Sequence, residues 1–341
     1  MKLVIVTGSG RSGTSSVAGT LKRLGLHIPQ PEVQTDERNP RGYYEPLWVA
    51  DFHKYLLNAI PVRTIDSRPD AGRVAMEAVT PEVEAQLREW LSEQFAAEPA
   101  GTIFAIKETR AYWVYPMWAR VASDLGAELS SLTMLRHPTQ VVRSRDSAYL
   151  TERSDQFRRQ RETTNVAAWM NSVFETERVT RSNPRAFVPY YDLIEDWRAT
   201  MTRACSQMEV PLGDLTAPHP VDDFLTASLN RSAAVWEGLM VHRDLVDLAE
   251  RTWSTAKLLA ADPADAGAID DLDKIRGEYV ELYETAAAVA LDETTFQVAA
   301  ARKKWQARLA AKDERIERLR AEVAELRKQV DGTDGRRRFR R

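Results

Sequence analysis

Short apolar runs alternate, over residues 1–222, with longer segments whose apolar positions recur every three or four residues. Each short run leads into polar residues and a helical pattern, and no hairpin signal joins one run to the next. Strands in this arrangement predict a parallel sheet covered by helices on both faces, which is an α/β fold. The predicted strands cover residues 3–6, 102–106, 131–135 and 186–191.

The pattern changes beyond residue 222, where helical periods continue to residue 300 without a persuasive strand. From about residue 305, apolar residues recur at alternating spacings of three and four, with Lys312 in one seam position. They are Leu309, Ile316, Leu319, Val323, Leu326 and Val330. This heptad predicts a short coiled coil. Because no second heptad segment is evident, we expect it to join copies of the chain into a homo-oligomer.

The chain is therefore expected to have four parts. They are an α/β core over residues 1–225, a helical extension over 226–301, a coiled-coil helix over 302–331 and a basic disordered tail over 332–341. Charge separates them as well: residues 302–341 hold 15 Lys and Arg against 7 Asp and Glu, so an acidic remainder accompanies a basic end. The arginine-rich tail is too charged to pack. We expect it to be solvated, with an anionic surface as the alternative partner.

Composition excludes several classes of protein. With 43% hydrophobic and 28% charged residues, the chain is typical of soluble proteins. Its single cysteine, Cys205, excludes an intrachain disulfide. No apolar run approaches the ~20 residues of a membrane span, and the run after Lys2 is too short for a secretory signal. The five histidines form no metal-binding spacing. We expect a cytoplasmic protein that needs no metal.

The first apolar run ends in a loop of small residues that opens directly into a helical segment. Backbone N–H groups in such a loop, together with a helix N-terminus, favour a bound phosphate or sulfate. Arg11 adds a charge that can hold an anion in two places, and neighbouring hydroxyls add donors. The loop therefore predicts an anion cradle for a phosphorylated cofactor, made by Gly10, Arg11, Ser12, Gly13, Thr14 and Ser15.

This loop nearly satisfies the P-loop pattern G-x-x-x-x-G-K-[ST], with Gly8 and Gly13 in place. Thr14 stands where the lysine belongs, and the positive charge sits at Arg11 instead. Because that lysine neutralises β- and γ-phosphates in kinases and nucleotide hydrolases, its absence weakens such an activity. A P-loop kinase or NTPase with a degenerate Walker A motif stays as an alternative.

Two separate motifs resemble the sulfotransferases that use 3′-phosphoadenosine 5′-phosphosulfate (PAPS). The segment Arg11-Ser12-Gly13-Thr14-Ser15 is similar to their [KR]-S-G-[TS]-[TS] loop, which holds the 5′-phosphosulfate. Arg136 and Ser144 stand at the eight-residue spacing of the family's 3′-phosphate ligands, an arginine that ends a strand and a serine on the next helix. The resemblance implies that PAPS is the donor and that the bisphosphate PAP is the product. Arg231 is a further candidate for the 3′-phosphate or adenine.

The same resemblance implies a catalytic base. Cytosolic sulfotransferases place a histidine two residues after a lysine at a strand end, but here Lys107 is followed by Thr109. Other branches, including carbohydrate-modifying ones, use a glutamate after the first helix, and Glu45 in Gly42-Tyr43-Tyr44-Glu45 looks like bacterial members of that kind. Glu45 is then the expected base, with Glu108 as the alternative. Arg11 and Lys107 would stabilise charge on the leaving phosphate oxygen.

The expected activity is therefore sulfuryl transfer from PAPS to a hydroxyl on a carbohydrate or glycolipid. The extension over residues 226–301 is expected to complete the acceptor site. A non-catalytic coiled-coil scaffold built on an inactive nucleotide domain is the second alternative. The residues that bind adenine are not identified by the sequence.

Overall fold

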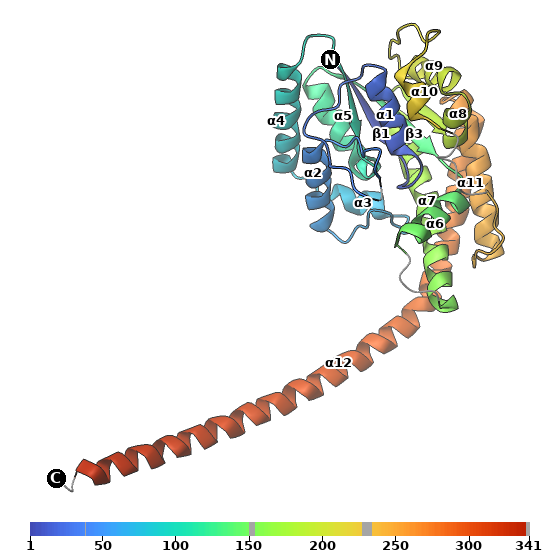
Figure 1. Ribbon diagram of the computed structural model, residues 1–341. Coiled ribbons are helices and arrows are strands. Elements are labelled where there is room, and N and C mark those ends of the chain that lie inside the picture. The colour runs from blue at the N-terminus through green and yellow to red at the C-terminus, as the bar shows by residue number, and fades with distance from the viewer. Residues whose placement is uncertain (38, 150–153, 227–233, 339–341) are drawn as a thin grey trace. The chain divides into compact units, whose positions relative to one another are not determined.

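The computed structural model describes residues 1–37, 39–149, 154–226 and 234–338 (Figure 1). In this part of the chain four strands form one sheet in the order β2-β1-β3-β4, and all neighbouring strands are parallel. They are β1 (Lys2–Thr7), β2 (Ile103–Lys107), β3 (Glu128–Leu135) and β4 (Arg185–Pro189). The predicted α/β fold with a central parallel sheet is confirmed.

The predicted fourth strand ends too late. Tyr190 and Tyr191 were expected within the strand but begin a helix, α8, instead. Pro189 precedes that helix with a φ of −61°, and it has no N–H with which to extend the strand ladder. The strand therefore stops at Pro189, and Tyr190 takes a position at the edge of the sheet.

Helices connect successive strands and cover both faces of the sheet (Figure 1). Those before β3 are α1 (Thr14–Arg23), α2 (Leu47–Asn58), α3 (Ala71–Met76), α4 (Pro81–Ala97), the 3₁₀ helix η1 (Ala111–Val114) and α5 (Tyr115–Asp124). Those after β3 are α6 (Pro138–Tyr149), α7 (Asp155–Thr180), α8 (Tyr190–Glu195), α9 (Trp197–Gln207), α10 (Pro220–Phe224), α11 (Arg243–Ala261) and α12 (Ala266–Arg338).

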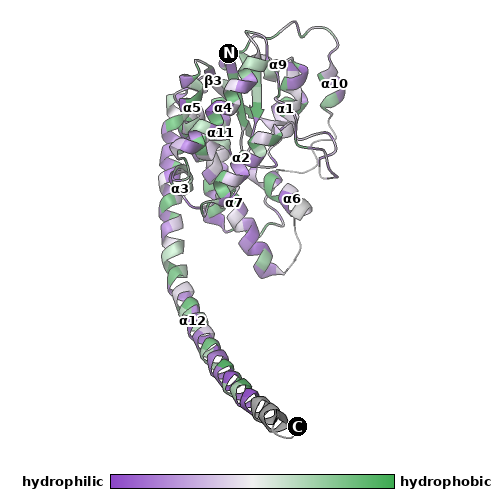
Figure 2. Cartoon of the chain, turned by 90° about the vertical axis from the view of Figure 1, so that its left-hand side faces the viewer, coloured by the Kyte–Doolittle hydropathy of each residue, from purple (hydrophilic) through white to green (hydrophobic). Residues whose placement is uncertain are grey.

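The last helix, α12, belongs to two units. One compact unit covers Met1–Val280 and the other covers Glu281–Arg341, whereas the sequence placed a boundary between residues 301 and 302. The backbone remains helical through Arg338, where a disordered tail was expected from residue 332. Arginine is a good helix former and can continue a helix that has already started. Figure 2 shows hydrophobic residues at intervals among hydrophilic ones along α12. No described helix is both long and apolar enough to cross a membrane.

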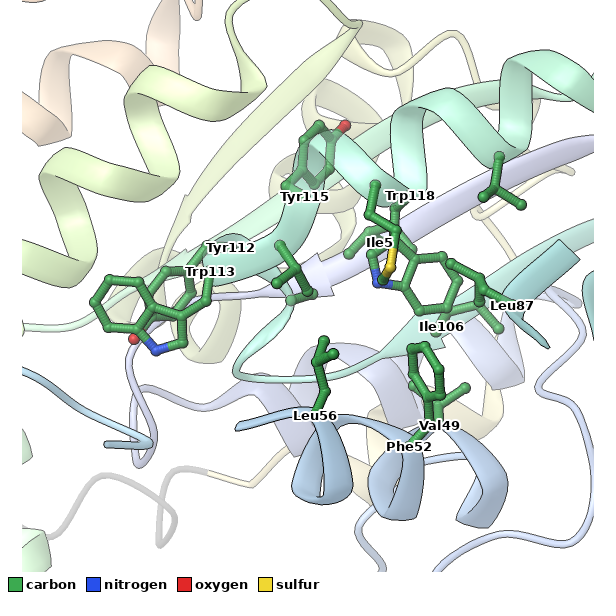
Figure 3. Packing of buried hydrophobic residues seen from close by; sticks show 14 of the residues in the cluster. Ile5, Val49, Phe52, Leu56, Leu87, Ile106, Tyr112, Trp113, Tyr115 and Trp118 are labelled. Atoms are coloured by element: carbon green, nitrogen blue, oxygen red, sulfur yellow. The ribbon is translucent and has the colours of Figure 1, made fainter. Parts of the chain in front are cut away.

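The hydrophobic core lies on both faces of the sheet because alternate residues of β1 point in opposite directions. Leu3 and Ile5 pack with residues of α2, α4 and α5, and Val4 and Val6 pack with residues of α1 and α9. Figure 3 shows the first of these clusters, in which Ile5 and Ile106 of adjacent strands lie near aromatic residues of α2, η1 and α5. This packing fixes the strand ends from which the candidate site is built.

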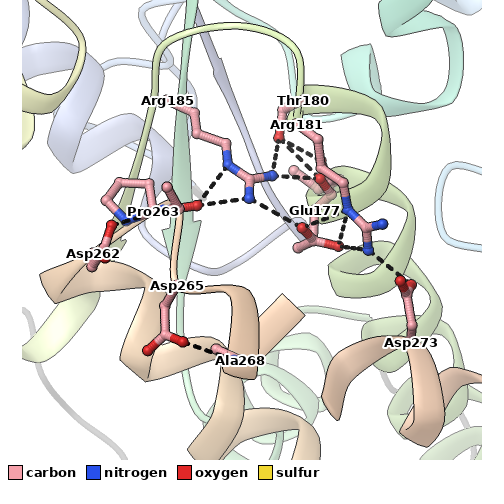
Figure 4. Close-up of polar contacts among 11 residues, drawn as sticks. Glu177, Thr180, Arg181, Arg185, Asp262, Pro263, Asp265, Ala268 and Asp273 are labelled. Atoms are coloured by element: carbon pink, nitrogen blue, oxygen red, sulfur yellow. Dashed lines mark hydrogen bonds and ion pairs between the residues drawn. The ribbon is translucent and has the colours of Figure 1, made fainter. Parts of the chain in front are cut away.

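A buried ion pair ties the outer strand to the helices beside it (Figure 4). Arg185 of β4 donates to the Glu177 side chain of α7 at 3.1 Å and to the Pro263 carbonyl oxygen at 2.7 Å. Arg181 also pairs with Glu177, and it reaches Asp273 of α12 at 2.8 Å. These contacts join α7, β4 and the first turns of α12.

Candidate functional site

The loop between β1 and α1 needs glycine at two positions. Gly8 has a φ of +127°, and a Cβ there would lie 2.6 Å from the carbonyl oxygen of Met134. Gly13 has a φ of +100°, and a Cβ there would lie 2.2 Å from a ring carbon of Tyr190. Glycine supplies both the left-handed backbone and the close approach. The two glycines of the degenerate P-loop pattern therefore shape the loop against β3 and α8.

The loop presents donors that the described residues do not satisfy. Among the described residues no side chain caps α1, and the Ser16 and Val17 N–H groups donate to the Gly13 carbonyl oxygen, so the Thr14 and Ser15 N–H groups are the ones at this helix end that a ligand can engage. The Ser12 hydroxyl is buried without a hydrogen-bond partner in the described part of the chain. Thr14 is also buried, and Gly10 lies beside the Arg145 guanidinium. This arrangement suits an anion, which would accept from the loop and from the helix N-terminus.

The structure brings Arg136 and Ser144 to the same loop. Arg136 follows β3, and its Nη1 donates to the Arg11 carbonyl oxygen at 3.2 Å. Arg11 Nε in turn donates to the Ser144 hydroxyl of α6 at 3.1 Å. Two motifs that lie more than a hundred residues apart in the sequence therefore form one cluster.

Arg136 is a buried cation with no acidic partner among the described residues. Its side chain lies over the Tyr190 ring, 4.5 Å from the ring centroid, and the residue is only 8% exposed. Its Nε has no hydrogen-bond partner, and no acidic side chain pairs with Arg136 or Arg11 among the described residues. Burial lowers the pKa of Arg136, Tyr190 opposes that effect, and the charge of Arg11 lowers it further. The cluster is thus electropositive.

Lys107 and Glu45 lie on the other side of the loop. Lys107 ends β2 and forms an ion pair with Glu45, and its Nζ lies 3.5 Å from the Ser15 hydroxyl. The carbonyl oxygen of Glu45 accepts from the Val33 N–H at 2.8 Å, which fixes Glu45 just before α2. Burial raises the pKa of Glu45, and the neighbouring Lys107 opposes that rise. A carboxylate with a raised pKa beside an anion cradle is suited to accept a proton.

Glu108 is not suited to the same role. Both of its carboxylate oxygens accept from the Arg110 guanidinium at 2.7 Å, and the Arg110 N–H also donates to it at 2.8 Å. The side chain is 1% exposed. The geometry therefore favours Glu45 over Glu108, a choice that the sequence left open.

Some residues at the loop were not identified by the sequence. Asn39 donates to the Ser15 hydroxyl at 3.2 Å and to the Gly42 carbonyl oxygen at 2.6 Å, so it links the loop to the segment before α2. Tyr190 lies against Gly13 and Arg136. Neither residue has a distinguishing local pattern. Arg231, the weakest of the sequence candidates, lies outside the described residues.

The predicted helical extension contacts the opposite edge of the sheet from Lys107. Its helix α11 packs against α7 and β4, and the Glu250 carboxylate of α11 lies 3.0 Å from Nε2 of His137. His137 also contacts Thr139 at 2.7 Å and lies among Trp236 and Trp253. The described part of the extension thus supports the strand end that carries Arg136. Its role in the acceptor site stays a prediction.

Among the described residues, no group of three His, Cys, Asp or Glu side chains is placed to hold a metal ion. The site instead consists of the loop with Arg11, the cations Lys107 and Arg136, the Glu45 carboxylate, and the Arg145 guanidinium beside Gly10. Within the described ranges Arg11 and Arg136 lie without acidic partners, and Lys107 pairs with Glu45. This set can bind an anion and accept a proton next to it.

Comparison with known proteins gave limited similarity. No family model and no curated protein sequence matches the chain. Among solved structures, a sulfotransferase domain from the Synechococcus PCC 7002 olefin synthase is 16% identical; the match covers 73% of this chain and 93% of that domain, with a TM-score of 0.41. A sulfotransferase domain from the curacin biosynthetic pathway is 14% identical; the match covers 70% of this chain and 81% of that domain, with a TM-score of 0.38. Both matches are below 25% identity and assign no activity to this chain.

Proposed function

We propose that this protein is a sulfotransferase that moves the sulfuryl group of PAPS to an acceptor hydroxyl. The observation that carries the proposal is Arg136, a buried arginine without an acidic partner in the described part of the chain that touches the loop at Arg11. Removing a charge from water without pairing it costs several kcal/mol of folding free energy. A site that retains such a charge, beside an uncapped helix, is built for an anionic ligand.

PAP and PAPS carry anionic groups at both the 3′ and the 5′ positions, and the site has two sets of donors. We assign the 5′ end to the loop, with Gly10, Arg11, Ser12, Gly13, Thr14 and Ser15 as its ligands. We assign the 3′-phosphate to Arg136 and Ser144, and retain Arg231 as a further candidate. The buried, unpartnered Ser12 hydroxyl and Arg136 Nε support this fit. PAPS supplies an activated sulfuryl group when it is bound.

In the proposed reaction Glu45 accepts the proton of the acceptor hydroxyl. The acceptor oxygen forms a bond to sulfur, and the bond from sulfur to the phosphate oxygen breaks with its electron pair remaining on the phosphate. Lys107 and Arg11 then stabilise the charge that develops on that oxygen. Lys107 is suited to this role because it already lies between Glu45 and Ser15. The residues assigned here need no metal.

We propose a carbohydrate or glycolipid hydroxyl as the acceptor, because the proposed base is a glutamate, as in the carbohydrate-modifying branch that the sequence resembles. A kinase is disfavoured because Thr14 occupies the place of the phosphate-binding lysine.

Ligand-dependent thermal stability tests the proposal. A hundredfold excess of PAP over its dissociation constant, without metal, should stabilise the full chain by about 2.7 kcal/mol. Mg-ATP at the same concentration should stabilise it less, because it has no 3′-phosphate for Arg136 and Ser144. Stabilisation by Mg-ATP and not by PAP would replace the sulfotransferase with the kinase alternative. No response to either ligand would favour the scaffold.

A further inference from the structure

The second unit carries a regular stripe of exposed apolar side chains. From Leu309 to Leu326 they occupy the a and d positions of one heptad, interrupted only by Lys312. Toward the N-terminus the same register continues for two heptads at its d positions alone, with Thr295 and Arg302 at a, and the exposed Phe296 lies outside it. The side chains are between 45% and 64% exposed. They are Leu291, Val298, Trp305, Leu309, Ile316, Leu319, Val323 and Leu326. We call this stripe the seam.

We propose that the part of the seam from Leu309 to Leu326 joins two copies of this chain as an antiparallel two-stranded coiled coil, centred between Ile316 and Leu319. A seam of this spacing on a helix whose described side chains are all exposed from Glu284 to Lys328 is suited to knobs-into-holes packing against a second helix. The proposal concerns assembly and does not depend on the reaction at the loop.

Two charged residues within the seam favour the antiparallel orientation. Arg302 occupies an a position and Lys312 a d position. In a parallel, in-register pair each would face its own copy, which places like charges in contact. In the proposed antiparallel register Arg302 lies beyond the central layers and Lys312 faces Val323. The layers at the centre are Leu309 with Leu326, Lys312 with Val323 and Ile316 with Leu319, each occurring twice by symmetry.

The flanking charges select the same orientation. In an antiparallel pair, e positions face e positions and g positions face g positions. The proposed register then pairs Asp313 with Arg320 and Arg315 with Glu322, and both pairs are oppositely charged. A parallel pair would place Arg315 against Arg320 of the other copy, although it would also pair Arg308 with Asp313 and Glu322 with Arg327; the antiparallel register has no like-charged pair at these positions.

Neighbouring antiparallel registers are less favourable. A shift of one heptad in one direction pairs Asp313 with Asp313 and Arg315 with Arg315. A shift in the other direction pairs Arg320 with Arg320 and Glu322 with Glu322. Within its own helix Arg320 pairs with Glu317 at 2.7 Å, but both side chains are exposed, so this contact exchanges easily.

Charge reversal distinguishes the two orientations by the sign of its effect. We expect light scattering to give a dimer of the full chain, with its dissociation constant measured by sedimentation equilibrium. Arg320→Glu should weaken an antiparallel dimer about 4- to 30-fold, since two attractive pairs become repulsive. It should strengthen a parallel dimer, because the introduced carboxylate would then face Arg315 of the other copy. The double variant Asp313→Arg with Arg320→Glu should restore the antiparallel dimer, which controls for an effect on the helix itself.

Distances between labelled copies provide the second measurement. Cys205 is fully buried and burial raises the pKa of its thiol to about 12, so a thiol-reactive spin label should react only with an introduced cysteine. Ala307→Cys and Ala321→Cys place labels on the outer face of the helix. In the proposed register the two copies of residue 307 are about 31 Å apart along the axis and those of residue 321 about 10 Å apart, at a rise of about 1.5 Å per residue.

The expected result is a longer distance for the label at residue 307 than at residue 321. Equal distances would establish a parallel pair and overturn the proposal. Ile316→Asp should give a monomer, whereas Ala321→Asp, on the outer face, should remain a dimer. A wild-type monomer that sediments with phosphatidylserine vesicles would assign the seam to an anionic membrane surface instead, and would also overturn the proposal.

Discussion

Two buried arginines on neighbouring strands offer a direct comparison of binding and structural roles. Arg185 is 5% exposed and is held by Glu177 and by the Pro263 carbonyl oxygen. Arg136 is 8% exposed and has no acidic partner among the described residues. If the role of Arg136 is to bind an anion, its replacement should leave the stability of the ligand-free protein unchanged or higher and should lower the affinity for the ligand.

The free energies can be estimated from the contacts. Arg136→Met loses the hydrogen bond to Arg11, worth about 0.5–1.5 kcal/mol, and the contact with the Tyr190 ring, worth about 0.5–2 kcal/mol. It also removes a buried, unpaired charge whose desolvation costs several kcal/mol, on the order of both losses together. The ligand-free protein should therefore keep its stability or gain some. Arg185→Met should lose about 3 kcal/mol, at the low end for a broken buried ion pair, because Arg181 still contacts Glu177.

Urea unfolding without ligand measures the first quantity, and titration calorimetry with PAP measures the second. We expect Arg136→Met to weaken PAP binding about 10- to 150-fold, the equivalent of about 1.5–3 kcal/mol for hydrogen bonds to a charged group. Under conditions in which Arg185→Met is folded, it should bind PAP with an affinity close to that of the wild-type protein. A loss of ligand-free stability in Arg136→Met as large as in Arg185→Met, or an unchanged affinity for PAP, would refute the assignment of Arg136 as a ligand-binding residue.

Two further predictions concern the base and the loop. Glu45→Gln should lower kcat by about 10²–10⁴, followed as sulfated product by mass spectrometry, and unchanged turnover would move the base elsewhere. Because a base must be deprotonated and burial raises the pKa of Glu45, the wild-type rate should fall as the pH is lowered through that raised pKa, and the residual rate of Glu45→Gln should lack this dependence. Gly13→Ala should lower the free energy of unfolding in urea more than Gly25→Ala does. Both glycines have a positive φ, where alanine costs about 1–2 kcal/mol, but only at Gly13 does the new Cβ also clash with Tyr190, which costs about 1–3 kcal/mol more. Equal losses would mean that Tyr190 moves aside freely.

The sequence predicts the sheet well where its strands are wholly apolar. The run at residues 3–6 is buried throughout, and so is most of the run at 103–107. The third strand begins at Glu128, three residues before the predicted start, and the missed residues include Ser130, which is fully buried despite its hydroxyl. A serine in a buried strand gives no apolar signal, so only the pairing with β1 reveals it.

The candidate site divides in a similar way. The loop and the spacing of Arg136 and Ser144 are local patterns, and both are visible in the sequence. The choice between Glu45 and Glu108 is not local, since it depends on the Arg110 guanidinium that occupies both oxygens of Glu108. For the same reason the sequence does not identify Tyr190, because its place in the site comes from contacts with Gly13 and Arg136, which are far from it in the chain.

The strand order places cations on both sides of the loop, and no local sequence pattern shows this arrangement. Along the chain β1 comes first, but in the sheet it lies between β2 and β3. The loop that follows β1 is therefore flanked by Lys107 from the end of β2 and by Arg136 from the end of β3. The two cations differ, because Lys107 is paired with Glu45 and Arg136 has no acidic partner in the described part of the chain. We assign Arg136, which has no acidic partner among the described residues, to a permanent anion of the donor. We assign Lys107 and Glu45 to proton transfer, because their ion pair can exchange: as Glu45 takes the proton, Lys107 can turn to the leaving oxygen. With β1 at the edge of the sheet, one of these two cations would be missing from the loop.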